Sequence, residues 1–326
     1  KTMPARFSEG LSFTDGRAEL PGVIQTLRRQ EKADLVLLDS HLGFPQDMQL
    51  LQEISGVDVD LSAHTHHRLE RPARQGRTLV IQSGSHASFI TRLNLTLENR
   101  KVTDFSHRLI EISQAVEPDP EVQAMVDEAL KPFKAELDEL VGETRTALDR
   151  GINLESTMDN LLLSALLAHT GAEMAFSNGW RYGAPIPKGP IRLNHLYNMA
   201  PMNPPISTAE ISGTELLTML EENLEHTFSR DPTKQMGGYV KRALGIKVFF
   251  KIENPPYQRI QKLFINNEEL QPDRQYRTAF ITEQGIPARF GQNRQQHPDR
   301  IVDVMRIYLK QTGPIEMPLF GTYTPI

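Results

Sequence analysis

The sequence predicts an α/β protein whose second half has α+β character. Between residues 19 and 61, apolar residues at helical spacing alternate with short apolar runs, which is the rhythm of a parallel sheet. Residues 89–97 and 102–112 alternate apolar with polar side chains, as in an antiparallel hairpin. A long amphipathic pattern then starts near Pro118, so we expect a separate domain on each side of it.

The first domain is expected to contain, in chain order, a helix, a strand, a shorter helix and four further strands. These elements are placed at residues 19–31, 35–38, 48–54, 57–61, 79–82, 89–97 and 102–112. The helical spacing and the short apolar runs predict the first five elements. The two segments that alternate apolar with polar residues predict the hairpin, which turns at Asn99.

A connecting helix is expected after Pro118. Asp119 is a good N-cap, Pro120 suits the first helical position, and helical spacing continues to Gly142 with a kink at Pro132. The expected division is a first domain at 1–113, a linker helix at 114–141 and a second domain at 142–326.

The second domain mixes helices and strands. A helix follows Glu155, and a capping box, Ser212-Gly-Thr-Glu215, starts another. Strands are expected at 173–177, 245–252, 259–265 and 276–281.

Composition narrows the classes of partner and cofactor. The 326 residues carry a net charge of −5, which gives no basic footprint for nucleic acid. No apolar run approaches the ~18 residues of a membrane span, and the start at Lys1 has neither the charged nor the apolar region of a signal peptide. With no cysteine, a metal would be held by histidine, carboxylate or amide groups.

Three histidines follow the first two expected strands. His41 comes after the first, and His64 and His66 come after the second. Because ligands bind outside the carboxyl ends of strands in open α/β sheets, these side chains are expected to converge. In an extended segment, His64 and His66 would point to one side and offer two imidazoles to metal. The alternative is a set of loop histidines that bond to water or backbone.

The segments Ser40-His-Leu-Gly43 and Ala63-His-Thr-His66 resemble the last two metal-binding motifs of calcineurin-like metallophosphoesterases, specifically the 5'-nucleotidase family. Ala63 stands where that family usually has glycine. The resemblance implies the C-terminal part of a metallophosphoesterase β-sandwich with flanking helices, joined by a helix to a 5'-nucleotidase C-terminal α/β domain. It also implies a periplasmic or other extracytoplasmic location.

The same resemblance implies two divalent metal ions, Mn, Zn or Fe, with His41 and His64 on one ion and His66 on the other. The implied activity is hydrolysis of a phosphate ester or nucleotide by water activated between two metals. The family's upstream motifs (Asp-x-His, Gly-Asp and Gly-Asn-His) do not occur here. We therefore expect a fragment that lacks the N-terminal metal motifs, contains no catalytic residue and is inactive alone.

His86 is a candidate neighbour of the metal site. It ends Gln82-Ser-Gly-Ser-His86, which resembles the Gln-x-Gly segment after the family's last metal motif. The alternative is a histidine in a surface loop.

Recognition of a small anionic substrate is assigned to residues 177–183. Asn178 can donate and accept hydrogen bonds, Arg181 suits an anion, and Gly179 and Gly183 let the backbone approach a ligand. Arg181 is expected to face the cleft between the domains. The alternative is a tight turn, with Trp180 in the core.

Arg181 comes three residues after Asn178, and this spacing resembles the motif of the thiosulfohydrolase branch of the superfamily more than that of the nucleotidases. An alternative activity is therefore hydrolysis of a sulfonated protein thiol. The two phenylalanines that sandwich the base in nucleotidases are not recognisable here. A non-catalytic, substrate-binding module is the remaining alternative.

Overall fold

The structure, a computed structural model, describes residues 8–113, 115–177, 179, 182–237 and 239–326. The chain forms two compact units. Unit 1 combines Lys1–Pro118 with the later segment Arg230–Gly237, and unit 2 contains Asp119–Ser229 and Gly238–Ile326. Segment 230–237 joins unit 1 through helix α2 (Phe44–Glu53), where Nε2 of Gln46 donates a 2.7 Å hydrogen bond to the carbonyl oxygen of Pro232.

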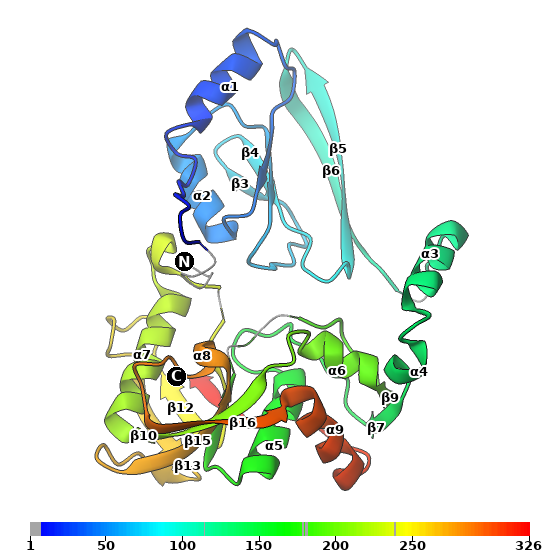
Figure 1. Ribbon diagram of the computed structural model, residues 1–326. Coiled ribbons are helices and arrows are strands. Elements are labelled where there is room, and N and C mark those ends of the chain that lie inside the picture. Colours follow the sequence, from blue (N-terminus) through cyan, green and yellow to red (C-terminus); the bar gives the residue numbers. More distant parts are fainter. Residues whose placement is uncertain (1–7, 114, 178, 180–181, 238) are drawn as a thin grey trace. The chain divides into compact units, whose positions relative to one another are not determined.

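Unit 1 is built on a mixed sheet with the strand order β1-β2-β4-β3. These strands are Leu37–Ser40, Val59–Ser62, Thr78–Ile81 and Ala73–Gln75. Strands β1 and β2 are parallel, as the alternation of helices and strands between residues 19 and 61 predicts. Strand β4 is also parallel to β2, and β3 is antiparallel to β4. Helices α1 (Leu20–Arg29) and α2 lie to one side of this sheet in Figure 1, over an apolar core.

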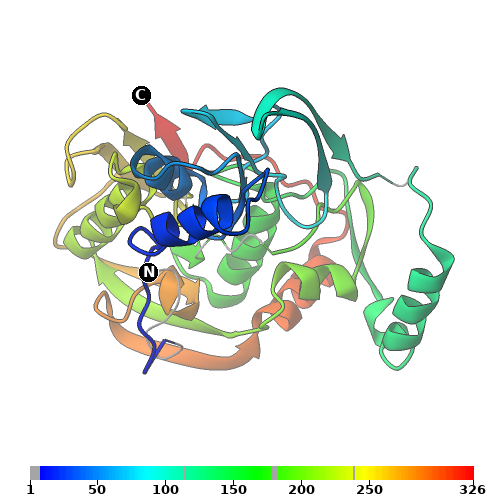
Figure 2. The same cartoon turned by 90° about the horizontal axis from the view of Figure 1, so that it is seen from above.

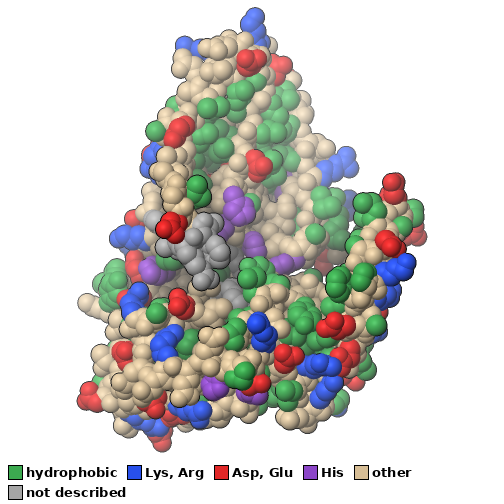
Figure 3. Space-filling view, viewed as in Figure 1, with side chains coloured by type: hydrophobic (Ala, Val, Ile, Leu, Met, Phe, Trp, Pro, Cys, Tyr) green, Lys and Arg blue, Asp and Glu red, His purple; other side chains and the backbone are tan. Residues whose placement is uncertain are grey.

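The expected hairpin is present as β5 (Phe89–Glu98) and β6 (Lys101–Glu111). Asn99 and Arg100 form its turn with positive φ angles of 50° and 62°, as a two-residue type I′ loop requires. One face of strands β1 and β2 is partly exposed to solvent, since Leu37 is 53% and Leu61 37% exposed. Figure 3 shows apolar side chains (green) gathered over this unit.

The prediction of one helix from Asp119 to Gly142 is wrong in its second half. The helix ends as α3 (Pro120–Leu130), and one turn follows as α4 (Lys134–Leu137). The chain then extends into β7 (Leu140–Thr144), which pairs with β9 (Gly189–Arg192). Pro132 lacks an N–H and interrupts the helix, and pairing with β9 gives residues 140–144 a partner that local pattern cannot reveal.

Helix α3 has an exposed apolar face. Val122 is 57% and Met125 67% exposed, and none of its residues is buried. Figures 1 and 2 both show α3 projecting from the rest of unit 2. The apolar residues of α3 are therefore spaced as on a helix, but none of them is buried in the described structure.

Unit 2 contains two larger sheets. The first has the order β11-β8-β15-β10-β16, formed by Arg242–Leu244, Met174–Ser177, Gln275–Ile281, Pro205–Ser212 and Gln292–Arg300. The second has the order β14-β13-β12-β17, formed by Glu268–Glu269, Ile260–Ile265, Ile246–Phe250 and Tyr323–Pro325. Parallel and antiparallel pairs both occur, which matches the expected α+β character.

Helices cover these sheets and complete the core of unit 2. They are α5 (Thr157–Thr170), α6 (Leu193–Met199), α7 (Gly213–Phe228), α8 (Thr282–Gly285) and α9 (Ile301–Thr312). A short 3₁₀ helix, η2 (Pro232–Lys234), lies in the segment 230–237 and therefore belongs to unit 1. The predicted capping box starts α7, because Ser212 Oγ accepts from Glu215 N and Glu215 Oε2 accepts from Ser212 N.

Candidate metal and substrate sites

The ends of β1 and β2 bring two of the predicted histidines together. Ser40 and Ser62 end these parallel strands in register, so His41 and His64 follow at the same edge of the sheet. The ring centroids of His41 and His64 are 5.1 Å apart, with 61° between the ring planes. The expected convergence at the carboxyl edge therefore holds for this pair.

His66 lies instead beside His86. Their ring centroids are 5.7 Å apart and their planes are at 78°. In the described part of the chain, no three His, Asp or Glu side chains are grouped as in a complete metal site. The histidines thus form two pairs, and a single site shared by His41, His64 and His66 stays a prediction.

The His-x-His segment is not extended, which corrects the expectation drawn from strand geometry. It lies in a turn after β2, where His64 and His66 have φ angles of 69° and 58°. His86 also has a positive φ, of 57°. Left-handed backbone costs about 1–2 kcal/mol per non-glycine residue, and such strain is concentrated at functional sites.

The spacing within each pair fits imidazoles that share an ion. At a metal–nitrogen distance of ~2.1 Å and a near-tetrahedral angle, two coordinating rings have centroids roughly 5 Å apart. The observed 5.1 Å and 5.7 Å agree with that estimate. Imidazole also suits the Zn and Fe ions that the resemblance implies.

Two buried carboxyl groups, which sequence reasoning did not single out, lie on or against the sheet of unit 1. Asp47 on α2 accepts hydrogen bonds from Ser40 Oγ at 2.5 Å and from Ser62 Oγ at 2.6 Å. Burial raises the pKa of Asp47, and these two bonds and the charge of His41 only partly oppose the shift. The burial of Asp47 could not be predicted from a local sequence pattern, because its hydrogen-bond partners Ser40 and Ser62 come from two different strands.

Asp60 on β2 is the second buried acid. Its side chain is 0% exposed, and in the described structure neither carboxyl oxygen has a hydrogen-bond partner. Burial raises the pKa of Asp60 to about 7, with smaller contributions from the charges of Asp47 and Asp39. Burial therefore keeps Asp60 protonated to a higher pH than an exposed aspartate.

The predicted substrate segment is only partly described, and Asn178 and Arg181 lie outside the described residues. Gly179 follows β8 with a φ of 65°, and a Cβ there would come within 2.8 Å of the Tyr239 ring. Gly183 has a φ of 91°, and a Cβ there would lie 3.1 Å from the sulfur of Met158. Close packing alone accounts for both glycines, and their role toward a ligand stays a prediction.

A buried cluster of charges contacts the backbone of Tyr182, near one end of this segment. Asp159 Oδ1 is 3.1 Å from Arg150 Nε, and Asp159 Oδ2 is 3.0 Å from Arg242 Nε. Nη1 of Arg150 also donates to the carbonyl oxygens of Tyr182 and Met199, at 2.8 and 2.7 Å. Asp159 stands where the resembling motif has glycine, and the structure supplies the reason: its carboxylate compensates two buried guanidinium groups.

Glu155, from the same motif, anchors the C-terminal segment. Its carboxylate accepts hydrogen bonds from Asn160 Nδ2 and from the backbone N–H groups of Phe320, Gly321 and Thr322. Glu155 therefore has a structural role, because it fixes the backbone of residues 320–322.

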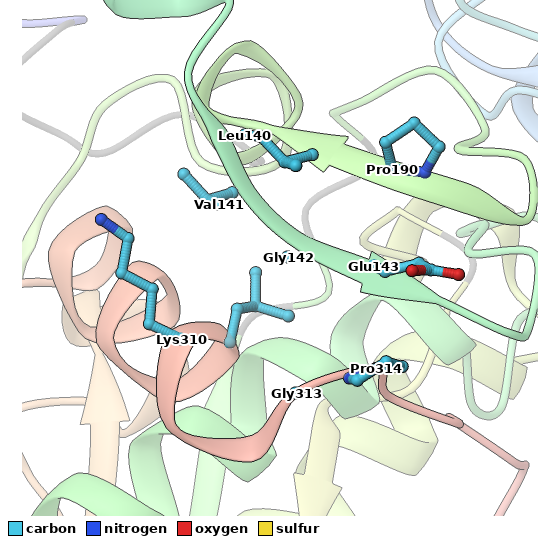
Figure 4. Close-up of a pocket in the computed structure, with 9 residues that line it drawn as sticks. Leu140, Val141, Gly142, Glu143, Pro190, Lys310, Gly313 and Pro314 are labelled. Carbon is cyan, nitrogen blue, oxygen red and sulfur yellow. The ribbon is translucent and has the colours of Figure 1, made fainter.

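A separate open pocket of about 520 Å³ lies between β7, β9 and the end of α9. Figure 4 shows its lining, which includes Leu140, Glu143, Pro190 and Lys310. None of the predicted site residues lines it.

None of the helices in the described ranges is long and apolar enough to cross a bilayer.

Comparison with known proteins identifies the second half of the chain. Residues 135–282 match the family described as 5'-nucleotidase, C-terminal domain. The trifunctional nucleotide phosphoesterase protein YfkN of Bacillus subtilis is 24% identical over 273 residues, which cover 79% of this chain and 18% of that protein.

Solved structures extend the likeness over the whole chain. The sulfate thiohydrolase SoxB of Thermus thermophilus matches with a TM-score of 0.90 and 28% identity, over 100% of this chain and 60% of that one. A 5'-nucleotidase precursor from the same organism shares the fold, with a TM-score of 0.79 and 19% identity over 97% of this chain and 68% of that one. The chain therefore spans little more than half of the solved thiohydrolase. Residues 135–282 therefore match the 5'-nucleotidase C-terminal domain, and the chain as a whole has the fold of these two solved structures, in agreement with the resemblance seen in the sequence.

Proposed function

We propose that this chain is part of a metal-dependent hydrolase of the 5'-nucleotidase family that acts on a phosphate ester or nucleotide. The observation that carries the proposal is the His41–His64 pair, which lies at the ends of two parallel strands at a spacing suited to one ion. Its presence in one chain with a 5'-nucleotidase C-terminal domain supports the same activity.

Under this proposal His41 and His64 hold one divalent ion and His66 the other, with His86 beside His66. The ions are Mn, Zn or Fe. When bound, such a pair supplies an activated water and neutralises charge at the reacting phosphorus or sulfur centre. The histidines of this chain hold and orient the two metal ions. The remaining ligands and catalytic groups come from a preceding part of a longer, extracytoplasmic protein.

The remaining parts have distinct roles in the proposal. Residues 1–113 are the C-terminal part of the metallophosphoesterase domain, residues 114–141 connect the domains, and residues 142–326 bind the substrate. Asn178, Gly179, Arg181 and Gly183 contact a small anion, for which a guanidinium offers paired donors.

A thiosulfohydrolase-like activity on a sulfonated protein thiol is the second candidate. It is favoured by the likeness to the SoxB structure, which has both the higher TM-score and the higher identity of the two solved structures compared. A non-catalytic substrate-binding module is the candidate outside the enzymes.

One set of assays separates the three candidates. The longer protein and the 326-residue chain are each given AMP, UDP-glucose and cysteine S-sulfonate, and their Mn, Zn and Fe contents are measured by elemental analysis. We expect the longer protein to hydrolyse one substrate class and the 326-residue chain to be inactive. A longer protein without stoichiometric metal would contradict both enzyme proposals and leave the binding module.

A further inference from the structure

Gln82 spans the turn that carries His64 and His66. It follows β4 and is 3% exposed. Its Nε2 donates to the carbonyl oxygen of Ala63 at 2.7 Å, and its Oε1 accepts from the backbone N–H of His67. One side chain therefore binds the residue before the His-Thr-His segment and the residue after it.

The turn between those two contacts needs such support. Thr65 N donates to Ala63 O at 2.9 Å, and His64 and His66 on either side of Thr65 both have left-handed backbone. Two such residues together cost about 2–4 kcal/mol, so the conformation persists only where surrounding contacts fix it. The amide of Gln82 supplies a donor and an acceptor at the two ends.

Thr65 fixes the middle of the turn. Its Oγ1 donates to Gln82 Oε1 at 3.2 Å, accepts from Phe44 N at 3.0 Å and lies 2.8 Å from Nδ1 of His67. Phe44 begins α2, whose N-cap residue Gly43 provides no side-chain cap. The turn is therefore docked on the start of α2, and His67 supports the turn from outside the two histidine pairs.

A second set of bonds ties Gln82 to the strand that leads to His41. Gln82 Nε2 donates to Ser62 Oγ at 3.1 Å, and Ser62 Oγ in turn donates to Asp47. Asp47 also accepts from Ser40, the residue before His41. A continuous chain of buried and partly buried hydrogen bonds thus connects the side chain of Ser40, next to His41, with the backbone on both sides of His64 and His66.

We infer that Gln82 is a positioning residue for the histidine pairs: it holds the left-handed turn that aims His64 and His66, and its link through Ser62 and Asp47 sets the spacing from His41. The inference rests on the proposed function, because the purpose of this spacing is to bind metal. Gln82 itself touches neither substrate nor metal in this scheme.

The test measures Zn²⁺ binding to the 326-residue chain by isothermal titration calorimetry, with Co²⁺ visible absorption as a second readout of ligand geometry. Gln82→Met keeps the size of the side chain and removes its hydrogen bonds to the turn. Losing an outer-shell partner typically costs about 10- to 100-fold in metal affinity, and we expect a loss in that range together with altered Co²⁺ bands.

Thr78→Val is the matched control. Thr78 lies at the start of the same strand, is buried, and donates a 2.8 Å hydrogen bond to Val57 O, away from the histidines. The variant loses one buried hydrogen bond, which costs about 1 kcal/mol of stability, and its Zn²⁺ affinity should stay within about twofold.

The outcomes separate this inference from the proposed function. Unchanged Zn²⁺ affinity and Co²⁺ bands in folded Gln82→Met would overturn the positioning role. If Gln82→Met does not fold, Gln82→Glu keeps the length and the acceptor and is measured instead; failure of both to fold would make Gln82 a residue of general stability and also overturn the inference. Unchanged Zn²⁺ binding in His41→Ala and His64→Ala would instead refute the metal assignment.

Discussion

Nε of Arg242 lies 3.0 Å from Oδ2 of Asp159, with side chains only 2% and 1% exposed. Arg150 occupies the other carboxylate oxygen, so one buried acid compensates two buried guanidinium groups. Because Arg150 also binds the carbonyl oxygen of Tyr182, the cluster holds one end of the predicted substrate segment.

Asp159→Asn should strongly destabilise the protein. Removing one partner of a buried ion pair leaves uncompensated charge and costs about 3–5 kcal/mol, which urea denaturation can measure. Glu268→Gln is the control, because its pair with Arg274 is solvent-exposed and worth less than about 1 kcal/mol. Equal, small effects of the two substitutions would show that the buried cluster contributes no more than a surface pair.

Asp60 should make stability depend on pH. Its pKa is raised from 3.8 to about 7 by burial, so below pH 3.8 the folded and unfolded states are both protonated. As the pH rises towards 7, the unfolded chain gives up its proton first, and the free energy of unfolding falls until the folded pKa is passed. Between pH 5 and 8 this loss should be about 2–3 kcal/mol.

Asp60→Asn removes the titrating group. Its free energy of unfolding, from urea denaturation at pH 5 and pH 8, should lack the Asp60 contribution to the slope. A slope identical to that of the unsubstituted chain would mean that other groups produce it.

Ser212→Ala should cost about 1 kcal/mol, because Ser212 Oγ accepts the N–H of Glu215 at the start of α7. Thermal unfolding followed by circular dichroism measures the loss. Ser212→Asn, which can replace the cap, should recover most of it. A stable Ser212→Ala variant would mean that Glu215, which also accepts from Gly291 N, holds the helix start alone.

Arg181→Lys tests the substrate segment in the longer protein. Loss of a charge-assisted, paired contact typically costs ~1.5–3 kcal/mol, so KM should rise roughly ten- to a hundredfold. Metal content and melting temperature should stay nearly unchanged. A large fall in melting temperature with unaltered kinetics would make Arg181 a structural residue.

Local patterns in the sequence predicted the parallel strands that precede His41 and His64, the hairpin and the helix caps. They did not predict β16, since Gln292–Arg300 is polar apart from Pro298 and lacks the alternation that marks a half-buried strand. This edge strand is held by its pairing with β10. Residues 140–142 were likewise expected at the end of a helix, but they belong to strand β7 because the chain pairs with β9 there.

The sequence by itself determined where the chemistry-bearing histidines lie along the chain, because a strand end is a local feature of apolar spacing. Only the tertiary structure decided how they are arranged: His41 with His64, His66 with His86, and a left-handed turn where an extended one was expected. The physical reason is that the groups that hold this arrangement, Asp47 and Gln82, act through hydrogen bonds to residues on other strands. Such partners become neighbours only when the sheet forms.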